Sequence, residues 1–157
     1  MGFLLVDSAF LPFIKTLISN AKSEVCLSTF KIEHNEKPRG RLLEELFSIL
    51  FQKAAQGVKV KLLINWHDDR RSVAKTNLSA CQVLKNHGIE VRHLRYNRCC
   101  HAKTIIVDNS TAVVGSHNLS LRSCQNNFEI SYILSEPESV KCLSSVFNQS
   151  WYDAKNF

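Results

Sequence analysis

The sequence predicts an α/β domain in which a mixed β-sheet is flanked by helices. In the first half of the chain, apolar patterns typical of helices and of strands alternate, as they do in α/β folds. In the second half, strand-like runs at 103–107 and 111–114 enclose the turn-forming residues 108–110, which predicts a hairpin. Of the 157 residues, 45% are hydrophobic, enough for a real core. We therefore expect a single domain over residues 1–157.

The elements of the first half follow from the spacing of apolar residues. From Phe10 to Ile18 these recur at helical intervals, with Asp7 or Ser8 as the expected N-cap, and Gly57 is expected to end the next helix. In chain order we predict a helix at 10–18, a strand at 24–32, a helix at 42–55, a strand at 58–64, a helix from Asn77 or Ser79 to 87–88, and a strand at 89–94. The second half adds strands at 103–107, 111–114 and 129–134 and a closing helix at 137–152.

Charge and cysteine content narrow the choice of partners. The net charge of +6 favours anionic partners but does not separate nucleic acid from lipid headgroups. The six cysteines form no Cys-x-x-Cys pair, which indicates reduced thiols in an intracellular protein. No stretch approaches the length of a membrane span or a signal peptide, so the sequence as it stands predicts a cytoplasmic protein. A leader or anchor outside these residues is left open.

The segment from His101 to Asp108 combines an imidazole and an ammonium with apolar strand-forming residues. His101 and Lys103 are two residues apart, so on a strand they point to the same face. A lysine on a sheet face is costly unless it meets solvent or an anion. Ser116 and Asn118 share a face in the same way, and Gly115 before them allows close backbone approach. Together these groups predict a site for phosphodiester chemistry.

These residues identify a family. His101-x-Lys103, Asp108 and Gly115-Ser116-x-Asn118 follow the pattern HxKxxxxD(x)6GSxN, which resembles the phospholipase D superfamily, in particular its small bacterial endonucleases. Glu129 stands where those nucleases carry a downstream acidic residue. The core motif spans about thirty residues, and the order of helices and strands is compatible over nearly the whole chain.

The resemblance implies a two-step covalent mechanism. His101 would attack phosphorus to form a phosphohistidine. Lys103, Ser116 and Asn118 would hold the non-bridging oxygens, and Glu129 would hydrogen-bond the imidazole. Asp108 and Gly115 would be structural. No metal or other cofactor is expected, because lysine supplies the positive charge. Zinc at Cys99–His101 and a metal at His67–Asp69 are both disfavoured, since adjacent ligands rarely share one site.

The resemblance also implies a partner. The family's active site uses two such motifs, one histidine as nucleophile and the other as general acid. This chain carries one, and none of its other five histidines has a lysine two residues on. We therefore expect a homodimer that shares one active site across its two-fold axis.

Further basic and aromatic residues are weaker candidates for contacts with nucleic acid. Arg95 and Arg98, just before His101, are favoured for steering an anion. Arg70, Arg71 and Lys75, and likewise Lys37, Arg39 and Arg41, follow strands in charged loops where a solvated surface is equally expected. Trp66 and Tyr96 are more plausible as packing residues than as stacking platforms for bases.

The sequence thus favours a metal-independent phosphodiesterase, a non-specific endonuclease acting on DNA or RNA as a homodimer. The main alternative is a phospholipid hydrolase or transphosphatidylase acting at a membrane, since the same site cleaves either kind of diester. It is less favoured because no amphipathic basic helix is evident. A catalytically silent nucleic-acid-binding dimer is a third possibility, disfavoured by the intact set of candidate catalytic residues.

Overall fold

The computed structural model describes residues 3–34, 41–66, 71–95 and 98–157, with the side chain of Arg71 left out. Its strands are β1 (Phe3–Val6), β2 (Glu24–Thr29), β3 (Lys59–Ile64), β4 (Glu90–His93), β5 (Thr104–Val107), β6 (Thr111–Gly115), β7 (Ile130–Leu134) and β8 (Lys155–Asn156). Its helices are a 3-10 turn η1 (Asp7–Ala9), α1 (Phe10–Ser19), α2 (Arg41–Ala55), α3 (Arg71–Asn86), α4 (Leu121–Gln125) and α5 (Pro137–Asp153). The predicted α/β fold with a mixed sheet is confirmed.

The strands form one sheet in the order β1-β7-β6-β5-β2-β3-β4-β8 within the described residues. β2, β3 and β4 are parallel, and the remaining pairs are antiparallel. The carboxyl ends of β2, β3, β4 and β6 therefore meet the amino ends of β5 and β7 at one edge of the sheet. The segments that precede β5 and follow β6, which carry most of the predicted site residues, both lie at this edge.

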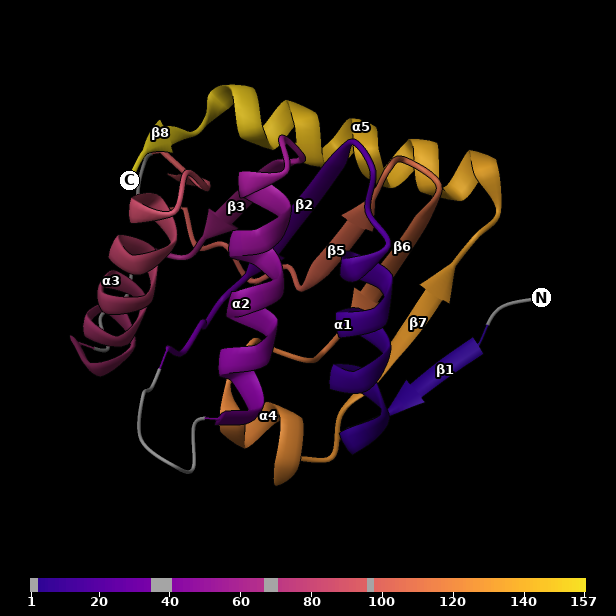
Figure 1. Cartoon of the computed structure of the whole chain (residues 1–157), viewed down its shortest axis with the longest axis horizontal. Helices are drawn as coiled ribbons and strands as arrows, with labels where there is room; N and C mark the ends of the chain where they lie inside the picture. The colour runs from indigo at the N-terminus through magenta and orange to yellow at the C-terminus, as the bar shows by residue number, and fades with distance from the viewer. Residues whose placement is uncertain (1–2, 35–40, 67–70, 96–97) are drawn as a thin grey trace.

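Helices cover the two faces of the sheet unequally. In Figure 1, α1 and α2 lie in front of the sheet, while α5 runs along its upper edge. Residues from α1, α2 and α3 pack with Val25 and Leu27 of β2 in the larger core cluster. α5 contributes Val140, Phe147 and Trp151 to a smaller cluster that includes Cys26. Successive residues of β2 thus supply both cores, as the alternation of side chains along a strand requires.

The structure corrects the expected beginning of α3. The helix starts at Arg71, six residues before Asn77. Asn77 is fully buried within the helix, where its side chain accepts a hydrogen bond from the Ile32 N–H and donates to the carbonyls of Phe30 and Asn65. Its polar side chain therefore binds the ends of two neighbouring segments instead of capping a helix.

The expected N-cap of the first helix is also wrong. The N-cap of α1 is Ala9, without a side-chain hydrogen bond. The carboxylate of Asp7 instead accepts a hydrogen bond from the Glu129 N–H at 2.8 Å, and Asp7 has a φ of 47°. This contact ties the end of β1 to the start of β7.

Three short elements had no counterpart in the prediction. β1 is an edge strand built from an N-terminal apolar run, α4 has five residues, and β8 has two. β2 also ends three residues earlier than predicted, and Ile32 forms an isolated bridge with Leu119 instead.

Candidate functional site

His101 and Lys103 lie together just before β5. The Lys103 Nζ is 3.1 Å from His101 Nδ1 and 3.3 Å from Nε2, and it donates to the His101 carbonyl at 2.7 Å. The Phe30 ring lies 5.2 Å from the imidazole and 5.8 Å from the ammonium. His101 is exposed and Lys103 is half-buried. The pair thus presents an imidazole and a cation to solvent beside an apolar ring.

Burial lowers the pKa of Lys103, although the thiol of Cys100 and the carboxylate of Glu129 act against this shift. The loss of hydration makes the charged ammonium less stable without an anion, which is the situation in a phosphate-binding site. A phosphate oxygen placed beside Nζ would replace the contact with the imidazole.

Ser116 and Asn118 follow β6 at the same edge of the sheet. The Ser116 hydroxyl accepts a hydrogen bond from the Ile130 N–H at 3.1 Å and is exposed. The side-chain oxygen of Asn118 accepts from the Lys31 N–H at 3.1 Å and from the Thr29 hydroxyl at 3.3 Å. Because both acceptor contacts use this oxygen, the amino group of Asn118 is the end available to donate elsewhere.

At Gly115, β6 and β7 approach each other too closely to admit a side chain. A Cβ at this position would lie 2.3 Å from the Ser131 Oγ and 2.4 Å from the Ile130 carbonyl oxygen. The Gly115 N–H also donates to the Lys103 carbonyl at 3.2 Å. Glycine is therefore required by the approach of the neighbouring strand, and it links the segment of Ser116 to that of Lys103.

Glu129 is held in a network of short polar side chains. Ser123 accepts a hydrogen bond from the Asn118 N–H at 2.8 Å and donates to Glu129 Oε1 at 2.9 Å, while the Asn127 amide donates to the same oxygen at 2.9 Å. Burial acts to raise the pKa of Glu129, but hydrogen bonds from Ser116, Asn127 and Ser123 outweigh it and hold the pKa below its ordinary value. The group is a buried, ionised carboxylate.

The predicted hydrogen bond between Glu129 and His101 is not among the contacts of the described residues. Within one chain, Glu129 is instead bonded to Ser116, Ser123 and Asn127. Its charge still acts on the site, because it counteracts the fall in the Lys103 pKa.

Asp108 lies at the opposite end of β5 from His101. Its carboxylate accepts hydrogen bonds of 2.8–2.9 Å from the N–H groups of Lys22, Ser23 and Glu24, and another from the Ser23 hydroxyl. Burial acts to raise its pKa, but these donors lower it to about 2. Asp108 thus joins the β5–β6 turn to the segment before β2.

Sequence reasoning gave no role to three residues that support the site. His117 is buried, stacks on Phe10 at 4.1 Å, and contacts the Ser131 hydroxyl and the Asp7 carbonyl. Asn65 accepts from the Cys100 N–H at 3.0 Å, just before His101, and Ser123 bridges Asn118 and Glu129. The roles of His117 and Asn65 depend on contacts between segments far apart in the sequence, and that of Ser123 depends on the turn that α4 makes between Asn118 and Glu129. The sequence carries no signal for either.

Only some of the basic residues predicted to contact nucleic acid lie near His101 in the described part of the chain. Arg98 lines a pocket of 220 Å³ together with His101, and Arg95 and Arg98 line an adjoining one of 270 Å³. Lys75 lies apart from this pair, and Arg71 is the first residue of α3. Arg70 lies outside the described residues, as do Lys37, Arg39, Tyr96 and the segment 67–69. Trp66 packs edge-on against Phe157 at 4.8 Å, as a packing residue would.

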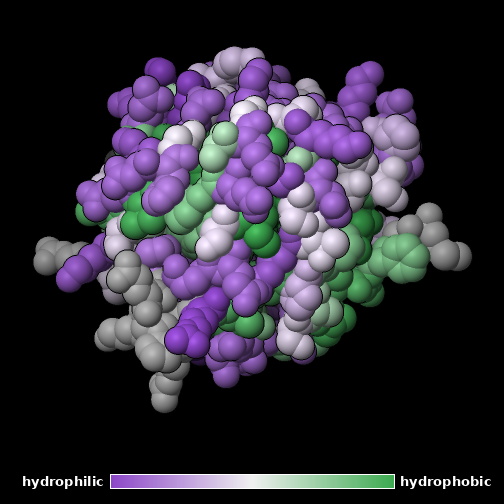
Figure 2. Space-filling view, in the orientation of Figure 1, coloured by the Kyte–Doolittle hydropathy of each residue, from purple (hydrophilic) through white to green (hydrophobic). Residues whose placement is uncertain are grey.

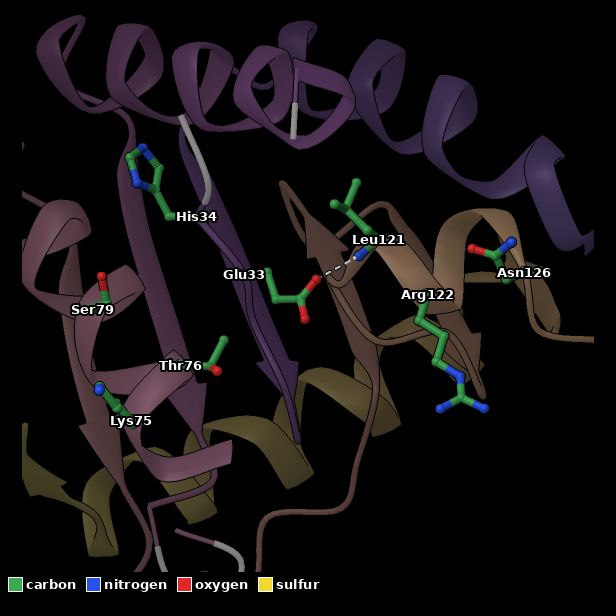
Figure 3. Close-up of a pocket in the computed structure, with 8 residues that line it drawn as sticks. All are labelled: Glu33, His34, Lys75, Thr76, Ser79, Leu121, Arg122 and Asn126. Atoms are coloured by element: carbon green, nitrogen blue, oxygen red, sulfur yellow. Dashed lines mark hydrogen bonds between the residues drawn. The ribbon is translucent and has the colours of Figure 1, made fainter. Parts of the chain in front are cut away.

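Lys75 lines a pocket of 760 Å³ between α3 and α4 (Figure 3). Arg122 reaches it from α4 and Asn126 from the residue that follows this helix, while Thr76 and Ser79 reach it from α3. Glu33 lies between the two helices, where its carboxylate accepts a hydrogen bond from the Leu121 N–H at 2.8 Å. None of His101, Lys103, Ser116 or Asn118 lines this pocket.

The described residues contain neither a cluster of metal ligands nor a membrane-spanning helix. No three His, Cys, Asp or Glu side chains among them are grouped to hold a metal ion. Cys99 is exposed while Cys100 is buried, which raises the Cys100 pKa to about 11. Across the same described ranges, no helix is long and apolar enough to cross a membrane.

Comparisons with known proteins agree on a family. A family model described as "Cardiolipin synthase, PLD-like domain" matches residues 14–151. The chain is 33% identical over 132 residues to a cardiolipin synthase of Oceanobacillus iheyensis, an alignment that covers 84% of this chain and 26% of that protein. It therefore spans about a quarter of the length of the curated relatives it matches.

Two solved structures of similar size share the fold. Nuc from Salmonella typhimurium, a phospholipase D family member, superposes with a TM-score of 0.78 at 21% identity, covering 100% of this chain and 99% of Nuc. NucT from Helicobacter pylori superposes with a TM-score of 0.79 at 16% identity over the same shares. At these identities the likeness is one of fold.

Proposed function

The chain belongs to the phospholipase D superfamily, in the PLD-like domain family of the cardiolipin synthases, and on that premise we propose that it is a metal-independent nuclease for DNA or RNA. The observation that carries the proposal is the contact of the Lys103 ammonium with the exposed His101 imidazole, next to Arg98. An exposed nucleophile with a cation at hydrogen-bond distance suits attack on a phosphodiester.

In the proposed reaction, a ring nitrogen of His101 attacks phosphorus and the bond to one ester oxygen breaks, leaving a phosphohistidine. Water then attacks the phosphorus, and the bond to the imidazole breaks. Lys103, the Ser116 hydroxyl and the Asn118 amino group bind the non-bridging oxygens as their charge increases. Glu129 acts through its negative charge, which counteracts the fall in the pKa of Lys103 and so supports its charged form. Arg95 and Arg98 attract the next phosphates of a polyanion.

The proposal includes a homodimer. The leaving oxygen needs a proton, and the chain has a single His-x-Lys segment to hold a nucleophile or an acid. A two-fold axis beside His101 would bring in a second imidazole from an identical subunit.

A phosphatidyl transferase or phospholipid hydrolase is the second candidate function. It is supported by the 33% identity to a cardiolipin synthase, whereas the nuclease is supported by a likeness of fold to Nuc and NucT. Both functions break a phosphodiester bond. They differ in whether the surroundings of His101 bind a nucleic acid or a phospholipid.

One experiment decides between them. Wild type, His101→Ala and the matched control His87→Ala are incubated in excess EDTA with plasmid DNA, with RNA, and with fluorescent phosphatidylglycerol in vesicles. His87 is an exposed histidine after α3 that stacks on Phe51. We expect EDTA-resistant cleavage of nucleic acid by wild type and His87→Ala, and none by His101→Ala.

Three other results would overturn the proposal. Turnover of lipid alone would favour the second candidate. Loss of cleavage in EDTA would exclude the metal-free mechanism. Binding of nucleic acid without turnover of any substrate would leave a non-catalytic binding protein.

A further inference from the structure

Two basic residues face a pocket that the proposed reaction does not use. Lys75 and Arg122 line the 760 Å³ pocket between α3 and α4, and Figure 3 shows them on opposite sides of Glu33. Among the described residues, the Lys75 ammonium has no hydrogen-bond or ion-pair partner. Arg122 donates from Nε to the Asn127 side chain at 3.3 Å, which leaves its terminal nitrogens unpaired within that part of the chain. Both cations are therefore available to a ligand.

The other charged groups in the pocket are already paired. Glu33 forms an ion pair with Lys31, and His34 Nε2 lies 3.1 Å from a carboxylate oxygen of Glu44. Ser79 adds a neutral hydroxyl. In Figure 2, hydrophilic residues predominate at the lower centre of the molecule, where Figure 1 places α4. Because Lys31 balances the charge of Glu33, the two unpaired cations make the pocket favourable for an anion.

A short segment connects this pocket with the proposed nucleophile. Phe30 contacts the His101 ring, and Glu33 lines the pocket three residues later. Three residues of extended chain span at most about 11 Å. The Phe30 carbonyl accepts a hydrogen bond at 3.0 Å from Asn77 of α3, the helix that also lines the pocket. The pocket is thus held within reach of a strand of a few nucleotides that has one phosphate at His101.

The pocket and Arg98 belong to opposite sides of the sheet. α3 and α4 contribute Cys81 and Cys124 to the core cluster that includes α1 and α2. Arg98 lines a pocket with His101 and with residues of α5, the helix that packs in the other cluster. An extended polyanion that crosses the edge of the sheet at His101 would therefore meet basic residues on both sides.

We propose that the pocket of Lys75 and Arg122 binds a remote phosphate of the nucleic-acid strand whose scissile phosphate lies at His101. The proposal rests on the proposed nuclease function and adds a second phosphate subsite to it. A phosphatidylglycerol headgroup carries one phosphate, so it has none left for this pocket. A nucleic-acid strand carries one at every nucleotide, and its contacts accumulate with length. The affinity for a strand is therefore expected to depend on whether it is long enough to reach the pocket.

The test measures how binding depends on the length of the strand. Every protein carries His101→Ala, so that the strand stays intact, and fluorescence anisotropy follows binding of labelled oligothymidylates of two or eight nucleotides in EDTA. Lys75→Met combined with Arg122→Met should raise the dissociation constant of the eight-nucleotide strand about tenfold or more, and that of the dinucleotide less than about twofold. The slope of log K against log salt concentration should fall by about 1.4 for the longer strand, since each phosphate contact of a single strand contributes about 0.7.

The matched control removes two lysines at the opposite edge of the sheet. Lys22 precedes β2 and Lys59 begins β3, and both are exposed. Lys22→Met combined with Lys59→Met changes the net charge by the same amount, so a general attraction between the protein and a polyanion would weaken equally in both double variants. We expect less than about a twofold change in the control for either strand.

A single variant guards against indirect effects. Arg122 contacts Asn127, which donates to Glu129, so its replacement also alters the network of the candidate site. Lys75→Met removes no contact among the described residues. It should raise the dissociation constant of the longer strand about threefold and lower the salt slope by about 0.7. Thermal unfolding verifies that each variant is folded.

Three results would overturn the subsite. An equal loss of affinity in the control would reduce it to a general attraction. An equal loss for the dinucleotide would place the two cations at the reacting phosphate. Titration calorimetry with inorganic phosphate provides the third: binding that the double variant abolishes, with unchanged affinity for the longer strand, would assign the pocket to a free anion.

The outcomes keep the subsite separate from the proposed function. A strand that binds with the expected dependence on length, yet is not cleaved by the protein with intact His101, would support the subsite while rejecting the nuclease. Cleavage by that protein, with binding that neither Lys75→Met nor the double variant weakens, would reject the subsite and leave the nuclease standing.

Discussion

The two ends of β5 put polar residues of one motif to different uses. At its amino end, the Lys103 ammonium contacts an exposed imidazole and has a lowered pKa because of burial. At its carboxyl end, Asp108 accepts four hydrogen bonds from Lys22, Ser23 and Glu24, where β2 begins. The charged groups at the amino end are accessible to solvent, whereas the carboxylate at the other end is hydrogen-bonded within the protein and stabilises the fold.

The difference shows how a motif can combine chemistry with structure. His101, Lys103 and Asp108 lie within eight residues, yet the four residues of β5 separate them across the sheet. A group whose hydrogen-bonding capacity is satisfied inside the protein has little left for a substrate. We therefore expect substitutions at the amino end to affect activity and those at the carboxyl end to affect stability.

Replacing the proposed nucleophile is expected to have the largest effect. His101→Ala should lower the cleavage rate by about 10⁴-fold or more, since no covalent intermediate can form. Because His101 is exposed, the midpoint of thermal unfolding should change little. Single-turnover cleavage and a thermal melt on the same preparation provide the comparison. Residual activity within tenfold of wild type would remove His101 from the proposed role.

Lys103→Met is expected to have the next largest effect. This substitution keeps a long apolar side chain against Phe30 and removes the ammonium, so it should lower the rate by about 10²–10³-fold. Its stability should equal or slightly exceed that of wild type, because burial destabilises the ammonium. Lys103→Arg is the control that retains charge. A stability loss larger than the activity loss would mean that the two ends of β5 do not differ as described.

Much of the fold could be predicted from sequence because it follows from local patterns. The runs that became β3 and β5 are apolar and bounded by turn signals, and α2 has helical spacing that ends before Gly57. β1 and α4 could not be recognised, because four apolar residues or five helical ones contain too little periodicity. The start of α3 was predicted six residues too late because Asn77 resembles an N-cap, whereas its side chain forms hydrogen bonds in the protein interior.

The candidate site could be predicted only in part, because some of its contacts do not follow from local sequence patterns. His101, Lys103, Ser116 and Asn118 lie in short segments at the ends of neighbouring strands, so their spacing places them near one another. The environment of Glu129 depends on Ser123 and on Asp7, 122 residues away in sequence, which contact it only in the folded chain.

Gly115→Ala tests the connection between the two strands that carry the site. The added methyl group would lie 2.3–2.4 Å from atoms of β7, two of them backbone atoms, so a strand must shift. We expect the free energy of unfolding to fall by about 3 kcal/mol, as for other overpacked positions. Because Ser116 follows directly, the rate should also fall in protein that remains folded. Urea unfolding gives the first value, and an unchanged midpoint would contradict the close approach of β6 and β7.

The smallest expected effect belongs to Asp108→Asn, and its pH dependence gives it a distinctive signature. Asparagine tolerates the φ of 51° found here but places an amide NH₂ group against N–H donors, so the loss should be about 2 kcal/mol at neutral pH, with little change in activity. The folded pKa of Asp108, about 2, lies below its ordinary value of 3.8. The carboxylate therefore stabilises the fold fully above pH 3.8, and this stabilisation is lost as the pH falls toward 2. Urea unfolding of both proteins between pH 6 and pH 2 should show the gap in free energy closing over that range. A gap independent of pH would mean that the charge of Asp108 is not what holds this end of β5.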